Sequence, residues 1–289
     1  MSDVPRRARA EGRRAAKAVA RLPWRAVQAL PLLPQQRVQL LLGRPLPAGG
    51  CVWSALDPEA AYAQHPSPEL VELALRAAAE ACETGLTGLV ERARAVGSPA
   101  AAWVDTFPGE HYRLLAALVR VMHPTLVIEI GTYLGASALA FLEHAGDDTR
   151  IVTYDVIPWD ELDGSLLTPG DFSDRRLEQR IGDLAESRYW STQSDLFVGA
   201  DLIFLDGPKD GIFEPRMLET LASLRPEREI LLVVDDIRFL EMLEPWARFP
   251  SPRLDLTSFG HWSGTGLALL PAQPLAAAGA GVGVGVGRE

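Results

Sequence analysis

Residues 125–135 read TLVIEIGTYLG, an apolar run that leads directly into a turn with two glycines, Gly131 and Gly135. The run at 125–130 predicts a strand buried on both faces, because it is almost continuously apolar. Glycines at the turn after a strand let the backbone approach a bound ligand closely. The stretch therefore predicts a strand, a ligand-binding turn and a helix that continues through Leu142.

The same alternation of short apolar strands and helices continues along the chain to residue 270. The patterns predict strands at 125–130, 150–155, 177–181, 201–205, 229–234, 253–259 and 266–270, and further helices at 68–96, 110–122, 213–224 and 237–243. Apolar strands that alternate with helices are typical of a parallel sheet covered on both faces. We therefore expect an α/β fold that is Rossmann-like and doubly wound, with a mostly parallel seven-stranded sheet and an N-terminal helical cap.

Composition divides the chain of 289 residues into four predicted parts. Residues 1–50 form a basic, partly disordered arm, residues 51–122 the helical cap, residues 123–271 the α/β domain and residues 272–289 a disordered Gly/Ala/Val tail. The arm holds ten Lys/Arg against two Asp/Glu, whereas the remainder holds 18 against 36 and the net charge is −10. The acidic body argues against a nucleic-acid substrate. The basic arm is either a solvated arm or a contact for an acidic surface.

The chain shows no sign of export or membrane insertion. No apolar run is long enough to span a bilayer, and Arg21, Pro23 and Arg25 interrupt the only segment that could resemble a signal peptide. Two cysteines, Cys51 and Cys82, suggest no disulfide framework and fit a reducing compartment. These features predict a cytoplasmic protein. The oligomeric state stays open, with a homodimer as one option.

Acidic residues follow the predicted second and third strands. Asp155 ends the second strand, where a carboxylate can accept hydrogen bonds from both hydroxyls of a ribose, and Asp183 follows the third, where it could face an adenine edge. A strand-end aspartate also commonly caps the next helix, so each residue alone allows both interpretations. The dinucleotide fingerprint has glycine where this chain has Tyr133, which disfavours NAD.

A second polar group follows the predicted fourth and fifth strands. Asp206 ends the fourth strand, and three residues later comes Lys209, one of only two lysines beside 26 arginines. A lysine, unlike an arginine, can lose its proton and act as a base, although a solvent-facing lysine in a polar turn is the alternative. Asp235 and Asp236 end the fifth strand. Three carboxylates at one sheet edge would need a hard cation such as Mg²⁺, unless Asp235 and Asp236 only cap the helix at 237–243.

These segments are similar to those of a known enzyme family. The segment Glu129–Gly135 resembles the glycine-rich motif of class I S-adenosylmethionine (SAM)-dependent methyltransferases. The stretch GEHYRLLAALV at 109–119, followed by VIEIGTYLGASAL at 127–139, resembles the catechol and caffeoyl-CoA O-methyltransferase branch, as does DGPKD at 206–210. The resemblance covers roughly residues 105–270 and implies that residues 123–271 form a SAM-binding methyltransferase domain.

The resemblance also implies roles for particular residues. Those expected to bind the cofactor SAM are Glu129, Gly131, Thr132, Tyr133, Gly135, Ser137, Asp155, Asp183 and Asp206. The metal ligands would be Asp206, Asp235 and Asp236, and the general base would be Lys209. The catechol-type pattern ends in Asp-Asn, whereas this chain has Asp235-Asp236. An all-aspartate triad is more similar to macrocin-type O-methyltransferases, which act on sugar hydroxyls of antibiotics.

The expected function is therefore a SAM-dependent, divalent-metal-dependent O-methyltransferase for a small hydroxylated acceptor, either a catechol-like phenol or a hydroxyl in natural-product biosynthesis. The alternatives are a metal-independent small-molecule methyltransferase, a non-catalytic binding protein with the cofactor fold and, more distantly, a nicotinamide-dependent reductase. The sequence favours a surface position for His111, although the resemblance implies that this region abuts the cofactor. The loop after Trp159 is a candidate lid over the acceptor. His261 and Trp262 in the last hairpin are a candidate second base or aromatic substrate wall, although a packed loop is the simpler interpretation.

Overall fold

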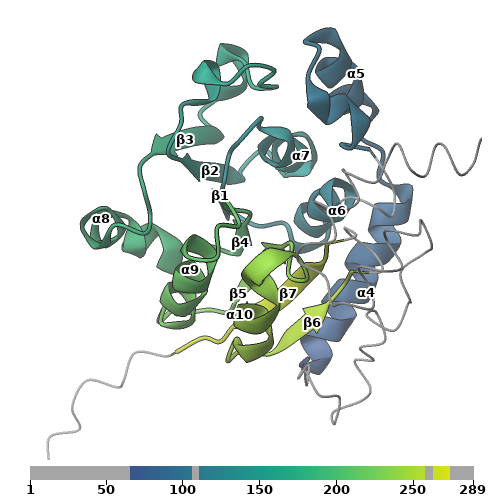
Figure 1. Ribbon diagram of the computed structural model, residues 1–289. Coiled ribbons are helices and arrows are strands. Elements are labelled where there is room, and N and C mark those ends of the chain that lie inside the picture. Colours follow the sequence, from purple (N-terminus) through teal and green to yellow (C-terminus); the bar gives the residue numbers. More distant parts are fainter. Residues whose placement is uncertain (1–65, 106–110, 258–262, 274–289) are drawn as a thin grey trace, which may run out of the picture.

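The computed structural model describes residues 66–105, 111–257 and 263–273 and contains one seven-stranded sheet (Figure 1). The strands are β1 (Leu126–Ile130), β2 (Arg150–Asp155), β3 (Leu177–Ile181), β4 (Leu202–Leu205), β5 (Ile230–Asp235), β6 (Arg253–Asp255) and β7 (Thr265–Leu270). Their order is β3-β2-β1-β4-β5-β7-β6, in which β7 runs antiparallel to both of its neighbours and the other pairs are parallel. The predicted Rossmann-like, mostly parallel α/β sheet is confirmed.

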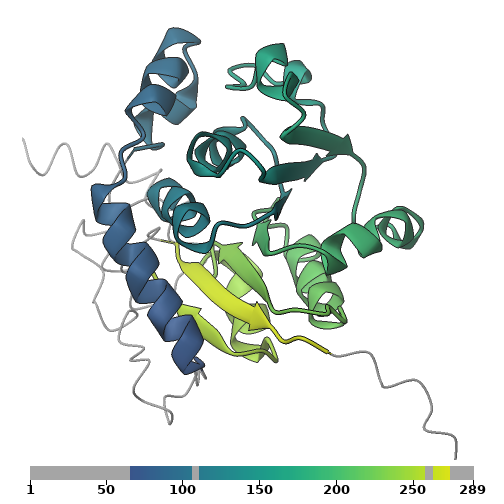
Figure 2. The same ribbon diagram turned by 180° about the vertical axis from the view of Figure 1, so that it is seen from behind.

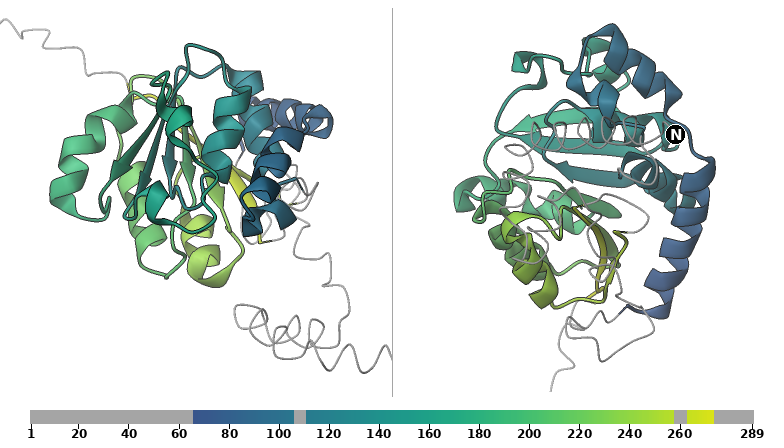
Figure 3. Two further views of the ribbon diagram at one scale, coloured as in Figure 1. Left: turned by 90° about the horizontal axis from the view of Figure 1, so that it is seen from above. Right: turned by 45° about the vertical axis from the view of Figure 1, so that its right-hand side comes forward.

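Helices cover both faces of the sheet, as Figure 3 shows from above. One layer comprises α4 (Pro68–Glu83), α5 (Thr87–Ala95), α6 (Tyr112–Met122) and α7 (Ala136–His144), and the other comprises α8 (Ser187–Val198), α9 (Phe213–Ala222) and α10 (Leu243–Arg248). Successive strand residues point to opposite faces, so Val127 packs in the first layer and Ile128 in the second. This burial on both faces explains why the strands read as apolar runs.

The first described helix, α4, packs against the sheet itself. Figure 2 shows α4 lying along β7, and α4 contacts both β6 and β7. Helix α6, the last helix before β1, is buried from Leu114 to Val119 and contacts α4 and α7. The division into a cap at 51–122 and a domain at 123–271 stays a prediction, and residues 1–65 and 274–289, which include the arm and most of the tail, lie outside the described residues.

Two expected helices differ from the structure. The helix expected at 68–96 is two helices, because Thr84 is extended at the end of α4 and its hydroxyl bonds the carbonyl of Glu80 at 2.9 Å. No helix starts at Ile237, because the backbone N–H groups of Ile237 and Arg238 donate to carbonyls of Gly264 and Ser263 instead. A short 3₁₀ turn at Leu240–Met242 and then α10 follow.

Sequence reasoning also misjudged one strand and missed one helix. The last strand pair begins with β6, which ends at Asp255 rather than continuing to 259; residues 258–262 lie outside the described part of the chain. Helix α8 was not anticipated between the third and fourth strands. Its exposed face is polar, and only its inner face, with Trp190 and Phe197, packs on the sheet. None of the helices within the described residues combines the length and apolar character needed to cross a bilayer.

Candidate active site at the carboxyl edge of the sheet

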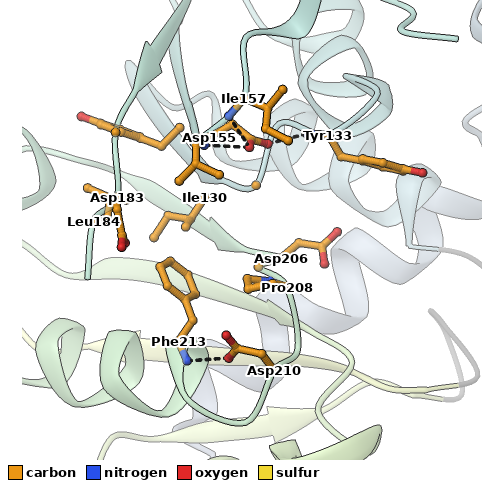
Figure 4. Close-up of a pocket in the computed structure, with 15 residues that line it drawn as sticks. Ile130, Tyr133, Asp155, Ile157, Asp183, Leu184, Asp206, Pro208, Asp210 and Phe213 are labelled. Atoms are coloured by element: carbon orange, nitrogen blue, oxygen red, sulfur yellow. Dashed lines mark hydrogen bonds between the residues drawn. The ribbon is translucent and has the colours of Figure 1, made fainter. Parts of the chain in front are cut away.

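The carboxyl ends of β1, β2 and β4 border a cavity of about 530 Å³ (Figure 4). Its lining includes Tyr133, Asp155, Asp183, Asp206 and Phe213. This is the edge at which open α/β sheets bind ligands, and the volume lies in the usual range for small-molecule sites of ~300–1,000 Å³. Three of the predicted cofactor-binding acids, Asp155, Asp183 and Asp206, therefore line one cavity.

Gly131 is required by the close approach of β1 and β4. Its φ is +104°, and a Cβ at this position would lie 1.9 Å from the backbone oxygen of Asp206. Gly135, with φ +81°, is similarly restricted, because its Cβ would lie 2.4 Å from Cγ of Leu167. Both glycines predicted from the motif thus occupy backbone positions that other residues cannot adopt without strain.

Asp155 and Asp183 organise turns and do not cap helices. The carboxylate of Asp155 accepts hydrogen bonds from the backbone N–H of Tyr133 at 2.9 Å and of Val156 at 2.7 Å, and Figure 4 shows it at the cavity. Asp183 accepts from the N–H of Ala185 at 2.7 Å, ahead of the N-cap of α8 at Glu186. Helix capping therefore does not explain either residue, and both carboxylates line the cavity.

The remaining motif residues lie around the β1 turn. The hydroxyls of Thr132 and Thr153 are 2.7 Å apart and buried, whereas Tyr133 is exposed with φ 42°. Ser137 is buried and lines a second, much smaller hollow that shares Gly131, Tyr133 and Asp206 with the large cavity.

Glu129 is completely buried beneath this turn. Burial raises its pKa to about 8; the nearby hydroxyls of Ser137 and Thr153 oppose the rise, and the charges of Asp206 and Asp155 add to it. Burial therefore favours the protonated form of the Glu129 carboxyl group. A protonated carboxyl can donate a hydrogen bond as well as accept one.

Lys209 is buried in a group of carboxylates, which excludes the solvent-facing interpretation. Its side chain is 7% exposed, and Nζ lies 2.7 Å from Oδ1 of Asp206 and 3.8 Å from Oδ2 of Asp236. Burial alone would lower the pKa of Lys209, but the carboxylates of Asp206, Asp235 and Asp236 together raise it above its ordinary value. In this arrangement Nζ holds its proton.

Glu214 is a buried residue near Lys209 that sequence reasoning missed. It is fully buried in the first turn of α9, and its Oε1 accepts a hydrogen bond from the backbone N–H of Lys209 at 2.6 Å. The same oxygen lies 3.9 Å from Nζ. Glu214 therefore holds the backbone of Lys209, which has φ 56°, in its left-handed conformation.

The adjacent strands β4 and β5 bring Asp206 and Asp235 together, as predicted. Leu205 pairs with Val234, so the two aspartates that follow them are neighbours at the same edge. Asp236 also reaches this edge, with φ 59° and a carboxylate that accepts a hydrogen bond from the Ser263 hydroxyl.

His111 is buried at this edge, and its predicted surface position is wrong. It is 3% exposed, and its Nδ1 lies 3.2 Å from Oδ1 of Asp235. Among the described residues, His111, Asp206 and Asp235 each offer a ligand atom, and these atoms all lie within 4.8 Å of one another. The sequence did not predict this position because it depends on the start of α6 lying beside the end of β5. No local sequence pattern indicates that contact.

Trp159 and His261 are the remaining candidates from the sequence. Trp159 stacks on Phe172, with ring centroids 5.5 Å apart, and its backbone N–H donates to Gln179 at 2.9 Å. It is therefore packed in its own loop, and nothing in its contacts indicates a lid. His261 and Trp262 lie outside the described residues.

Comparisons with known proteins give matches among solved structures only. No protein-family model matches the chain, and no curated protein matches it. A methyltransferase from Geobacter sulfurreducens is 21% identical, over 56% of this chain and 78% of that one, with a TM-score of 0.41. An O-methyltransferase from Bacillus cereus in complex with SAH is 20% identical, over 63% and 89%, with a TM-score of 0.46. The O-methyltransferase TomG from Streptomyces achromogenes, in complex with SAM and involved in tomaymycin synthesis, is 18% identical, over 64% and 90%, with a TM-score of 0.43.

At this level of identity, the chemistry of the chain has to be inferred from its own residues. Those residues form a cavity lined by carboxylates and, beside it, a group of carboxylates with a buried lysine at the same edge of a Rossmann-like sheet, and Asp206 belongs to both.

Proposed function

We propose that this protein is a SAM-dependent, divalent-metal-dependent O-methyltransferase that acts on a small hydroxylated acceptor, either a catechol-like phenol or a natural-product hydroxyl. One observation carries the proposal: Asp206 lines the 530 Å³ cavity and also pairs with Lys209 at 2.7 Å. The cofactor site and the proton-handling group are therefore adjacent. Methyl transfer requires that adjacency, because the acceptor oxygen must approach the sulfonium methyl in line.

The cavity suits the cofactor's nucleoside. Asp155 and Asp183 stand at the ends of two neighbouring strands, and carboxylates at these positions can accept hydrogen bonds from ribose hydroxyls and an adenine amine. The turn with Gly131 lets the backbone contact the ligand, which fits the predicted cofactor role of Glu129–Gly135. Tyr133 and Phe213 add aromatic surface to the lining.

A divalent cation would be held by Asp206 and Asp235. These two residues belong both to the predicted aspartate triad and to the group with His111 whose ligand atoms lie within 4.8 Å of one another. Buried or half-buried carboxylates at this spacing repel one another, and oxygen ligands suit a hard cation. When bound, the cation would offset the negative charge that holds the proton on Lys209 and lower the pKa of an acceptor hydroxyl.

Lys209 would then be the general base, because with the cation in place its ammonium group can release a proton to solvent and present a neutral amine. The acceptor hydroxyl gives its proton to Nζ, the acceptor oxygen forms a bond to the methyl carbon, and the bond from that carbon to sulfur breaks, so that the cofactor leaves as S-adenosylhomocysteine. Several finer points stay predictions from the sequence. They are magnesium as the bound ion, a role in natural-product biosynthesis, a homodimer, a cytoplasmic location and a contact of the basic arm with an acidic surface.

Asp155→Ala is expected to weaken SAM binding by about 10- to 100-fold, because each hydrogen bond to a charged group contributes about 1.5–3 kcal/mol. Isothermal titration calorimetry of the full chain with SAM measures this, with NADH as the comparison ligand and Asp147→Ala, an exposed residue, as the matched control. Normal SAM affinity in Asp155→Ala would refute the ribose role. Absence of SAM binding by the wild type would favour a non-catalytic protein.

Lys209→Ala is expected to lower turnover by roughly 100-fold or more, the usual contribution of a general base, while the SAM dissociation constant changes by less than about threefold. Lys209→Arg is the variant to compare with Lys209→Ala, because arginine keeps the positive charge but cannot release its proton. Turnover is measured with whichever catechol or hydroxylated natural product the wild type methylates. If Lys209→Arg keeps the turnover of the wild type, Lys209 acts through its charge alone. If Lys209→Ala loses turnover and SAM affinity equally, Lys209 has a structural role.

A further inference from the structure

We propose that His111 is the third protein ligand of the metal site, in the position for which the sequence predicts Asp236, and that the site therefore prefers a transition-metal cation such as Mn²⁺ or Co²⁺ over Mg²⁺. The proposal rests on the proposed function in one respect, namely that a divalent cation lies between Asp206 and Asp235. It adds the identity of the third ligand and the class of cation.

The directions of the strand side chains favour this set. Phe204 precedes Asp206 by two residues and Val233 precedes Asp235 by two, so each aspartate continues the face of its neighbour along the strand. Phe204 and Val233 both pack in the layer that contains α6. His111 is the N-cap of α6, and it therefore meets the two aspartates on the face toward which their strands direct them.

The position of the imidazole is fixed by its surroundings. Its ring lies 4.3 Å from that of Tyr112 and 5.4 Å from that of Phe204, measured between centroids. Nδ1 lies 3.2 Å from Oδ1 of Asp235, and both side chains are at most 5% exposed. A ligand atom within 4.8 Å of both carboxylates, held by packed rings on a sheet and a helix, needs little movement to complete a metal site.

Asp236 is engaged elsewhere. It follows the end of β5 in a left-handed conformation, and its carboxylate accepts a hydrogen bond from Ser263 and faces Lys209 at 3.8 Å. These contacts let Asp236 orient Lys209 and the segment before β7. His111 can then take the third coordination position of the metal.

The ligand set determines the class of metal. Carboxylates and water suit Mg²⁺, whereas an imidazole nitrogen favours transition metals, for which affinity rises from Mn²⁺ through Fe²⁺ to Co²⁺. Two carboxylates and one imidazole therefore favour Mn²⁺, Fe²⁺ or Co²⁺ over Mg²⁺. The three protein ligands leave the remaining positions for water or for an acceptor oxygen.

The test uses Mn²⁺ as the probe, added to the full chain after treatment with EDTA and desalting. Pulsed electron paramagnetic resonance detects the nitrogen of a coordinated imidazole, and calorimetry gives the affinities for Co²⁺ and Mg²⁺. We expect nitrogen coupling in the wild type and in His123→Gln, an exposed residue at the other end of α6, and its loss in His111→Gln. The same substitution should weaken Co²⁺ binding at least ~10-fold, the lower limit for disturbing a ligand shell, and Mg²⁺ binding much less.

Bound Mn²⁺ without nitrogen coupling in the wild type would overturn the proposal, and loss of Mn²⁺ binding in Asp236→Ala would then favour the predicted triad. Coupling that survives in His111→Gln and disappears in His261→Gln would also overturn it. If His111→Gln fails to fold, absence of nitrogen coupling in the wild type still overturns the proposal, and coupling that persists in both His123→Gln and His261→Gln still supports it. Absence of any bound Mn²⁺ would overturn the metal dependence along with this proposal, whereas SAM titration would still test the methyltransferase assignment separately.

Discussion

Gly131→Ala is expected to destabilise the fold by about 3 kcal/mol or more and to abolish SAM binding. The new Cβ would lie 1.9 Å from the backbone oxygen of Asp206, and neither strand can shift without breaking the pairing of β1 with β4. Its φ of +104° is a second source of strain. The free energy of unfolding is measured by denaturant titration, and SAM binding by calorimetry.

Gly88→Ala is the matched control for Gly131→Ala. Gly88 lies in α5, is exposed, and has only one atom, at 4.0 Å, near the place of a new Cβ. Alanine there should stabilise the protein slightly, by up to about 1 kcal/mol, because it favours helix. If Gly131→Ala matched this control in stability and bound SAM like the wild type, the close approach of the backbone would not be essential to the site.

Removal of divalent metal is expected to reduce turnover by roughly 100-fold or more, because a cation at an acceptor oxygen contributes several kcal/mol of charge stabilisation. Turnover is measured in excess EDTA and again after addition of Mn²⁺ or Mg²⁺ in excess of the chelator. We expect recovery with added metal, together with little change in the SAM dissociation constant, because Asp155 and Asp183 lie at the far strands of the cavity.

Asp235→Asn sharpens this experiment. Asp235 is 3% exposed and does not line the large cavity described above, so its substitution should impair metal-dependent turnover and leave SAM binding nearly intact. Undiminished turnover of the wild type in excess EDTA would instead support a metal-independent methyltransferase, in which the aspartates only orient Lys209.

The sequence predicted those parts of the fold that local pattern determines. Strands β1, β2, β4, β5 and β7 were anticipated because strands buried on both faces read as largely apolar runs. Asp206 and Asp235 were predicted as neighbours because parallel strands end at one edge. Helix α8 was missed because most of its residues are polar and only Phe197 among them is buried. The helix expected at 237 does not form, since its first N–H groups pair with residues 263–264, a contact between distant segments.

The site, like the fold, was predictable only where residues follow from their position along the chain. The strand-end acids and Gly131 follow from position along the chain, whereas His111 and Glu214 act through contacts across elements. A histidine at the start of an amphipathic helix has no local feature that distinguishes a surface position from a buried one. Its proximity to Asp235 arises only when α6 packs beside β5.

Three residues at this edge have left-handed backbone conformations without being glycine: Tyr133, Lys209 and Asp236. Each carries a conformational penalty of roughly 1–2 kcal/mol, which packing elsewhere in the domain must outweigh. The carboxyl edge is therefore a strained region that the rest of the fold has to hold in place, and we expect its geometry to relax early when the sheet is weakened. Loss of activity would then precede loss of structure as the protein is warmed.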